Sequence, residues 1–222
     1  MLLMVTLIFV SVLLAVVLLD VFVIQQWEAR HKPRPATDVD AALEIAVPRA
    51  IFLHPGHTWA RVDNDGRVAV GIDDLARTVI GDLSAFNLPS VGDRVTAGRP
   101  AAVIRQGDRQ LRLAAPLSGT VIESNEDFGR DPNRLRWRPY KEGWMYRLEP
   151  EEGVAREMAS LAIGKDAAVW MGDEIERLRR WFDDGRLAAP VEGALARGND
   201  EVWSAFKHDF LEFPRESGEV PA

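Results

Sequence analysis

The sequence predicts a mainly β domain that follows an N-terminal transmembrane helix and precedes a helical C-terminal tail. Three observations predict this arrangement. The first 24 residues carry no charged side chain except Asp20, short apolar runs between turn residues fill the middle of the chain, and helical periodicity dominates after Pro150. The predicted boundaries are residues 1–25 for the anchor, 26–46 for a juxtamembrane linker, 47–150 for the β domain and 151–222 for the helical extension.

Composition excludes several classes of protein. The 222 residues carry a net charge of −7, and no stripe dense in lysine and arginine indicates a nucleic-acid partner. The chain has no cysteine, so disulfides, thiol catalysis and cysteine-ligated metals are excluded together.

The N-terminal segment is long enough to cross a bilayer. A helix of its length would span roughly 36 Å, against a hydrocarbon core of about 30 Å. A cleavable signal peptide is the alternative, but the segment lacks the basic start, the short apolar region and the A-x-A-like site that such a peptide needs. Asp20 lies near the end of the span, where it either reaches headgroup water or forms an intramembrane partner site.

Flanking charge predicts the orientation of this anchor. No lysine or arginine precedes the segment, whereas Arg30, Lys32 and Arg34 follow it. The positive-inside rule therefore places the N-terminus outside and the main domain in the cytoplasm, in a single-pass protein of the cell membrane.

Within the β domain, short strands are expected around residues 60–62, 68–72, 95–96, 102–104, 111–113, 121–123 and 144–148. Glycine, proline, aspartate and asparagine separate them. One helical insertion is expected at residues 73–80, with Asp73 or Asp74 as its N-cap and Gly81 as its stop. Strands at 102–106 and 109–114 flank Gly107 and Asp108, a pair suited to a two-residue type II′ turn.

Several motifs in this region carry a family resemblance. They are His57-Thr58-Trp59, the segments V-A-V-G-I at 68–72, L-P-S-V-G-D at 88–93 and A-P-L-S-G-T-V at 115–121, and Glu142-Gly143-Trp144. Together they resemble the H protein of the glycine cleavage system over roughly a hundred residues. The resemblance implies a barrel-sandwich hybrid, also called a lipoyl- or biotinyl-like domain, with its strands in two small sheets.

The resemblance also implies where a lipoyl group would be attached. In that family the modified lysine lies eight residues before the proline of the S-P-x-S-G segment, which corresponds here to Asp108. An aspartate cannot form the amide that a lysine amine forms with lipoate, so no cofactor is expected. The only lysines are Lys32, Lys141, Lys165 and Lys207.

The surroundings of Asp108 differ from the family as well. Arg105, Arg109 and Arg112 replace a more acidic setting, which disfavours an attaching enzyme that docks by charge. The alternative for Gly107 and Asp108 is an ordinary surface turn.

The tail is predicted to be helical at residues 151–163, ending at Gly164, and at 166–184, ending at Gly185. The second helix would bury one face, formed by Val169, Ile175, Leu178 and Phe182. A third helix would place Val202, Phe206 and Phe210 together. The aromatic residues of the tail either pack within the protein or form a docking surface: Trp170, Trp181, Phe182, Trp203, Phe206, Phe210 and Phe213.

No motif indicates catalysis. His54 and His57 are spaced as H-x-x-H, but Pro55 and Gly56 prevent a helix that would align the two rings, so no metal site is expected. The pairs Asp73-Asp74 and Asp183-Asp184 are interpreted as helix-end residues. There is no G-x-S-x-G, P-loop or dinucleotide fingerprint, and we expect no catalytic residue and no small-molecule substrate.

Three functions remain open. The first is a membrane-anchored, non-lipoylated H-protein-like domain that serves as a docking or scaffold module for a protein partner, through the lipoyl-like domain or the tail. The second is a lipoyl carrier that shuttles an aminomethyl group in glycine cleavage. The third is an efflux-type membrane adaptor, which requires a long helical hairpin within the β domain and an extracytoplasmic location.

Overall fold

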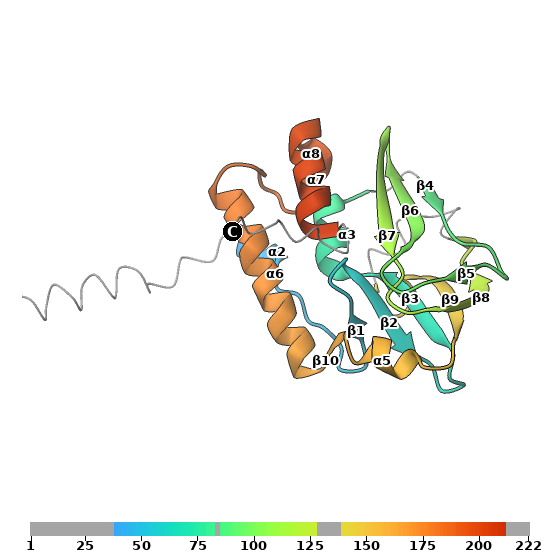
Figure 1. Cartoon of the computed structure of the whole chain (residues 1–222). Helices are drawn as coiled ribbons and strands as arrows, with labels where there is room; N and C mark the ends of the chain where they lie inside the picture. The colour runs from blue at the N-terminus through green and yellow to red at the C-terminus, as the bar shows by residue number, and fades with distance from the viewer. Residues whose placement is uncertain (1–37, 83–84, 128–138, 212–222) are drawn as a thin grey trace, which may run out of the picture. The chain divides into compact units, whose positions relative to one another are not determined.

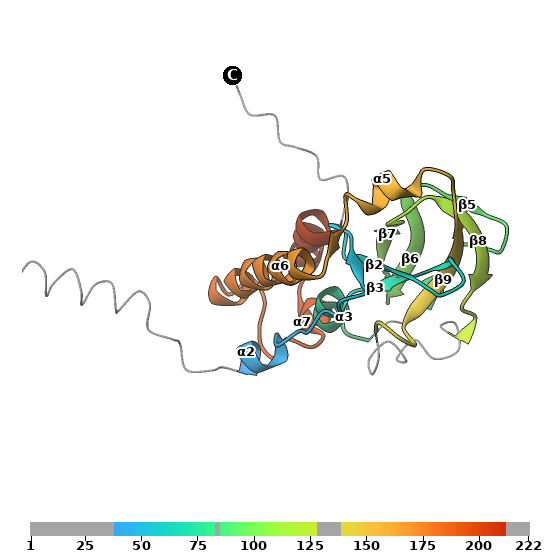
Figure 2. The same cartoon turned by 90° about the horizontal axis from the view of Figure 1, so that it is seen from below.

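The computed structural model describes residues 38–82, 85–127 and 139–211, which belong to one compact unit. Two antiparallel sheets form most of this unit, with a group of helices on one side of them (Figures 1 and 2). The predicted mainly β class is therefore confirmed. The predicted anchor at 1–25 and most of the linker at 26–46 lie outside the described residues. Among the residues that are described, no helix combines the length and the apolar character needed to cross a membrane.

The larger sheet has seven strands. In spatial order they are β10 (Ala162–Ile163), β1 (Phe52–Leu53), β2 (Thr58–Val62), β3 (Val68–Ile72), β9 (Trp144–Pro150), β8 (Gly119–Ser124) and β5 (Arg94–Val95). The smaller sheet has three strands, in the order β4 (Ala85–Asn87), β6 (Pro100–Gln106) and β7 (Arg109–Ala114). Strands β3 and β7 have the predicted bounds, whereas β6 begins two residues earlier than predicted.

The core lies between the two sheets, and strand alternation explains which side chains fill it. In β6 and β7 every second residue points inward, and Ile104, Leu111 and Leu113 are completely buried. Thr58 joins the sheets, because its hydroxyl in β2 donates to the carbonyl oxygen of Ala114 in β7 at 3.0 Å.

Helix α3 (Asp74–Ile80) lies where the sequence predicts it. Asp73 is its N-cap, and its carboxylate accepts a hydrogen bond from the backbone nitrogen of Ala76 at 2.9 Å. Gly81 ends the helix at φ 79°, a conformation that favours glycine. A Cβ at Gly81 would also lie 2.5 Å from the Cα of Gly193, so the close approach of the tail requires a glycine here.

The remaining helical elements are short except for one. They are α2 (Asp38–Ala42), α5 (Val154–Met158), α6 (Lys165–Asp183), α7 (Ala194–Arg197), α8 (Asp200–Phe206) and the π-helical turn η2 (Lys207–Leu211). Helix α6 and the pair α8–η2 match the second and third predicted helices of the tail.

The helix predicted at residues 151–163 is wrong. Only α5 is helical: it begins after Gly153, which adopts a left-handed φ of 90°, and it ends at Met158. Residues 162–163 instead form β10, in which Ala162 pairs with Leu53 and Ile163 with Phe52. The edge of the larger sheet offers backbone hydrogen bonds that local helical periodicity does not anticipate.

The buried face of α6 also differs from the predicted one. Val169 is 65% exposed, so its place on that face was wrong, and Ile175 and Phe182 are only half-buried, whereas Leu178 is buried as expected. The face that packs is a stripe at alternating spacings of four and three residues: Ala167, Met171, Glu174, Leu178 and Trp181.

Most of the tail aromatics pack within the protein. Trp181 meets the rings of Phe206 and Phe210 edge-on, both at 5.7 Å between centroids, and the two phenylalanines stack at 4.5 Å. Trp203 is also buried, while Trp170 is half-buried. Of the two alternatives for the tail, packing is confirmed for these residues, and Phe213 lies outside the described residues.

Candidate functional site

The β6–β7 hairpin carries the first candidate site at its tip. Gln106 pairs with Arg109, so Gly107 and Asp108 form a two-residue turn. Gly107 has a φ of 60°, and Asp108 does not have a positive φ, which together match the predicted type II′ turn. Asp108 is exposed at the tip.

Two side chains next to this turn fix the tip to neighbouring segments. The amide nitrogen of Gln106 donates to the carbonyl oxygens of Ile80 at 2.6 Å and Asp82 at 3.0 Å. On the other strand, Arg109 reaches the tail. The hairpin therefore presents Asp108 on a supported tip and not on a freely projecting loop.

Arg109 makes several contacts with α8 and the segment before it. Its guanidinium donates to the carbonyl oxygen of Gly198 at 2.9 Å, to that of Leu195 at 3.4 Å and to the carboxylate of Asp200 at 2.8 Å. The guanidinium carbon also lies 5.3 Å from the centre of the Trp203 ring, a cation–π distance. A cation that the sequence indicated as part of a basic surface is thus engaged within the protein.

None of the lysines that the structure describes lies close to the Gly107–Asp108 turn along the sequence, and none lies in the two strands that the turn connects. Lys141 is exposed before β9, Lys165 is the exposed first residue of α6, and Lys207 begins η2. Lys32 lies outside the described residues. The strands on both sides of Asp108 contain none.

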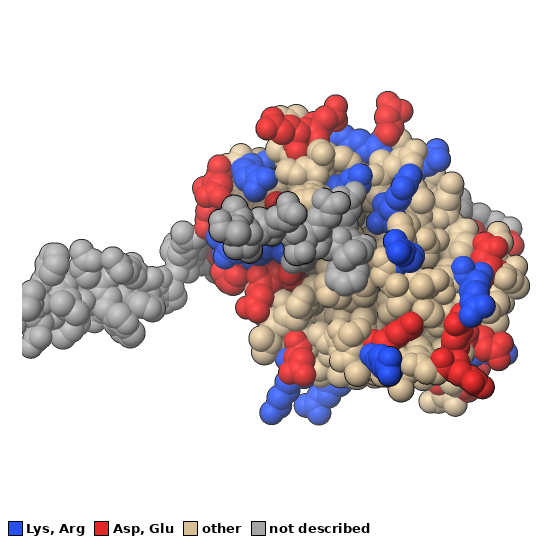
Figure 3. Space-filling model, viewed as in Figure 1, with Lys and Arg blue, Asp and Glu red and all other residues tan. Residues whose placement is uncertain are grey.

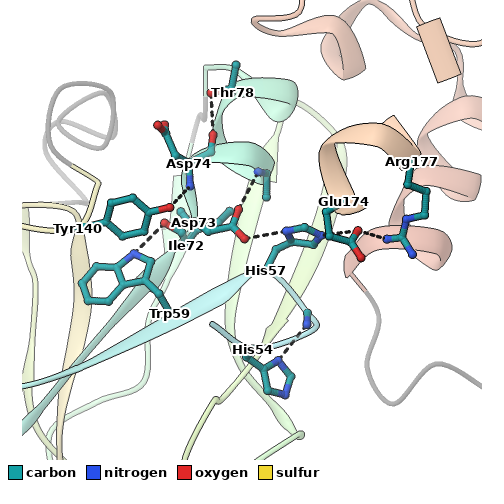
Figure 4. Close-up of polar contacts among 12 residues, drawn as sticks. His54, His57, Trp59, Ile72, Asp73, Asp74, Thr78, Tyr140, Glu174 and Arg177 are labelled. Atoms are coloured by element: carbon teal, nitrogen blue, oxygen red, sulfur yellow. Dashed lines mark hydrogen bonds and ion pairs between the residues drawn. The ribbon is translucent and has the colours of Figure 1, made fainter. Parts of the chain in front are cut away.

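The second candidate site is a buried group of charged side chains between the β domain and α6 (Figure 4). His57 is 1% exposed, and its Nδ1 lies 2.7 Å from the carboxylate of Asp73. Its Nε2 lies 3.5 Å from the carboxylate of Glu174, which in turn lies 2.5 Å from the guanidinium of Arg177. Acidic and basic side chains thus alternate in a network of four residues, in the order Asp73, His57, Glu174 and Arg177.

This arrangement changes the pKa of both histidines. Burial by itself lowers the pKa of His57, but the charges and hydrogen bonds of Asp73 and Glu174 outweigh it and raise that pKa to about 9. His57 is therefore protonated at neutral pH. Burial, and then repulsion from His57, lowers the pKa of His54 to about 4, so His54 is neutral and its Nδ1 accepts the backbone N–H of Gly56 at 3.0 Å.

Aromatic rings enclose the imidazolium. Its centroid lies 5.2 Å from the Trp170 ring and 6.0 Å from the Phe210 ring, and the Arg177 guanidinium lies 4.0 Å from the centre of Phe210. His57 also has a φ of 59°, a conformation that non-glycine residues rarely adopt. The tail therefore attaches to the β domain through a protonated, aromatic-lined histidine.

The sequence placed some of these residues and missed others. Asp73 and Asp74 are helix-end residues, as predicted, and Asp183 and Asp184 are the last residue and the C-cap of α6. His54 and His57 serve different hydrogen-bonding roles, and the described residues contain no group of three histidine, aspartate or glutamate side chains suited to a metal ion.

Glu174 and Arg177 were not anticipated as partners of His57. The available signal was that Glu174 lies in register with the apolar stripe of α6, where a charged residue requires a partner. That partner comes from a loop more than a hundred residues earlier, a contact that helical periodicity cannot reveal.

Comparison with known proteins identifies the family that this chain is similar to. The family model described as "Glycine cleavage H-protein" matches residues 52–174. Two relatives, both named glycine cleavage system H protein, are 39% identical to the chain. The one from Psychrobacter sp. matches over 105 residues, 47% of this chain and 83% of the relative, and the one from Xanthomonas euvesicatoria over 106 residues, 48% and 81%. A crystal structure of the glycine cleavage system H protein from Mycobacterium marinum matches at 32% identity with a TM-score of 0.44, covering 51% of this chain and 96% of that one.

Proposed function

Because this chain belongs to the glycine cleavage H-protein family, we propose that it is a membrane-anchored, non-lipoylated member that serves as a docking module for a protein partner. In this proposal the lipoyl-like domain keeps a recognition surface of the family and does not carry the swinging arm. The chain itself performs no catalysis.

One observation carries the proposal: Asp108 occupies the exposed tip of the β6–β7 turn. This is the position that the family resemblance assigns to the lipoyl-bearing lysine. A shift in register does not supply a lysine, since the sequence contains none between Lys32 and Lys141. A carboxylate in place of the amine cannot form the lipoyl amide.

The contacts of the hairpin are compatible with a docking surface. Gln106 and Arg109 hold the tip against α3 and the tail. A fixed hairpin suits a surface that a partner recognises by shape and charge.

Membrane anchoring in this proposal depends on the N-terminal sequence alone. The apolar residues 1–25 and the basic residues Arg30, Lys32 and Arg34 that follow them support a single-pass protein of the cell membrane, with the N-terminus outside and the domain in the cytoplasm.

The efflux-type adaptor is less well supported. Between β2 and β9 the helix that lies wholly within the described residues is α3, and it has seven residues. The long helix of the described chain, α6, comes after the strands of the β domain and not within them.

Intact-mass spectrometry of the native protein, purified from its own cells, tests the proposal. We expect the mass of the unmodified polypeptide. A lipoyl adduct on any of the four lysines would show that the chain is the lipoyl carrier of the alternative function. A lipoylated H protein purified in the same way serves as the positive control.

A further inference from the structure

The two faces of the β6–β7 hairpin differ in what covers them. The inward residues Ile104 and Leu111 are buried in the core, and at the tip Gln106 and Arg109 continue this face toward α3 and the tail. Because side chains alternate along a strand, the intervening residues form an outer face that points away from these contacts.

The outer face is defined by the registers of three strands. Ala85 in β4 pairs with Arg105 in β6, which pairs with Gln110 in β7; the next row joins Asn87, Val103 and Arg112. Of these six residues, Asn87, Arg105, Gln110 and Arg112 are exposed. None of the six is acidic.

Arg105 and Arg112 therefore lie on the same face of adjacent strands, as diagonal neighbours roughly 7–8 Å apart. Figure 3 shows basic side chains gathered over the hairpin with acidic ones above them at its tip and on the neighbouring helices. This positive surface contrasts with the net charge of −7 of the whole chain.

We propose that this outer arginine face, formed by Arg105 and Arg112, is the surface on which the module docks a carboxylate-rich protein segment. The inference rests on the proposed docking function and specifies its surface and the chemistry of its partner. A guanidinium donates two parallel hydrogen bonds to a carboxylate, so a pair of arginines on a rigid sheet selects for acidic side chains at matching spacing.

The charge at the tip favours a protein over an anionic bilayer as the occupant. Asp108 is exposed at the tip of the same hairpin. A bilayer broad enough to cover the outer face would also approach this carboxylate, which an anionic leaflet repels. A protein segment contacts the face and leaves the tip in water.

Binding of fluorescein-labelled poly-L-glutamate to the purified full chain in detergent, measured by fluorescence anisotropy, tests the proposal. The double variant Arg105→Gln/Arg112→Gln should bind about tenfold more weakly than the native chain. The matched control Arg67→Gln/Arg156→Gln removes the same charge from exposed arginines on the β2–β3 turn and α5, and it should bind within about twofold of native.

Three results would overturn the proposal: no binding by the native chain, equal weakening in both double variants, or full binding by the Arg105/Arg112 variant. Unfolding midpoints equal to that of the native chain show that both variants are folded.

A separate measurement detects binding of anionic lipid to the outer arginine face. Phenylglyoxal modification, followed by mass spectrometry, reports the accessibility of each arginine in micelles with phosphatidylglycerol or phosphatidylcholine. Protection of Arg105 and Arg112, but not Arg67, by phosphatidylglycerol alone would assign the face to anionic lipid and reject the protein partner.

The intact mass of the same preparation separates the failure of the proposed docking function from the failure of the proposed docking surface. A lipoyl adduct rejects the docking function, whereas an unmodified chain that does not bind polyglutamate rejects only the outer arginine face.

Discussion

At the scale of single residues, His57 shows how the fold changes the chemistry of a side chain. Burial by itself lowers its pKa, but two carboxylates, Asp73 from the N-cap of α3 and Glu174 from α6, outweigh burial and raise the pKa to about 9. A buried ion pair is a weak source of net stability, but the loss of one partner is costly because it leaves the other charge buried.

Glu174→Ala should therefore destabilise the protein by about 3 kcal/mol, since it leaves His57 and Arg177 without a shared carboxylate. Urea unfolding followed by tryptophan fluorescence measures this loss. Glu176→Ala is the matched control, because Glu176 is 61% exposed on the same helix and its pair with Arg179 should contribute less than about 1 kcal/mol. Equal effects of the two substitutions would refute the importance of the buried network.

The raised pKa of His57 also predicts a dependence of stability on pH. The folded-state value of about 9 lies above the ordinary 6.5, so the native state binds a proton that the unfolded state releases first. The stabilisation is complete below about pH 6.5 and is lost as the pH rises through 9.

The free energy of unfolding of the native chain should accordingly fall between pH 7 and pH 10, and that of His57→Asn should fall less. Asparagine is chosen because it tolerates the left-handed backbone of residue 57. Burial raises the pKa of Tyr140 and of Tyr146, so ionisation of these tyrosines in the unfolded chain lowers stability near pH 10 in both proteins alike, and the difference between the two curves reports His57. Parallel curves for the two proteins would show that His57 is not the titrating group.

At the scale of elements, the hairpin and the tail form one unit of structure. Arg109 contributes mainly through the carbonyl oxygens of Leu195 and Gly198 and the ring of Trp203, because its carboxylate partner Asp200 is almost fully exposed and water screens that pair. The close approach of Gly81 and Gly193 fixes the start of α7 beside the end of α3.

Arg109→Ala should destabilise the protein by about 2 kcal/mol and speed amide exchange at the tip of the hairpin, because the tail loses its hydrogen bonds to that strand. Hydrogen–deuterium exchange of peptides spanning residues 102–114 measures the effect. Arg112→Ala, on the outer face of the same strand, should leave exchange unchanged. Faster amide exchange in both variants would mean that the positive charge of the strand, and not the contact between Arg109 and the tail, stabilises the tip of the hairpin.

At the scale of the whole molecule, the tail completes the core of the β domain. Met171, Leu178 and Trp181 of α6 and Phe206 and Phe210 after it are all nearly or fully buried in one cluster with the strands. Strand β10 adds the tail to the larger sheet directly.

Truncation after residue 164 should therefore cause aggregation and not release a folded β domain, because it uncovers the apolar surface that α6 and α8 bury. Size-exclusion chromatography and binding of an apolar dye would detect this outcome. A monomeric, cooperatively unfolding truncated protein would instead show that the tail is a dispensable docking appendage.

The predicted membrane topology is tested on the full chain. A C-terminal reporter that is active only in the cytoplasm should be active, because the basic residues Arg30, Lys32 and Arg34 follow the apolar segment and none precedes it. Activity of an extracytoplasmic reporter at the same position would reverse the orientation and favour the adaptor function.

The sequence by itself determined the mainly β class, the bounds of β3 and β7, the N-cap of α3 and the turn that carries Asp108. These features depend on local patterns: alternation of apolar residues, a capping carboxylate, and a glycine that accepts a positive φ. The family resemblance also came from contiguous motifs, and it identified Asp108 by counting along the chain.

Only the tertiary structure decided how the tail is used. Residues 162–163 became strand β10 because the edge of a distant strand offered backbone hydrogen bonds, and Glu174 became buried because His57, far away in the sequence, supplied its partner. Arg109 likewise turned inward to the tail while Arg105 and Arg112 remained on the outer face. Such contacts arise from packing between segments far apart in the chain, and the free energy of burial that selects them is not encoded in the periodicity of either segment alone.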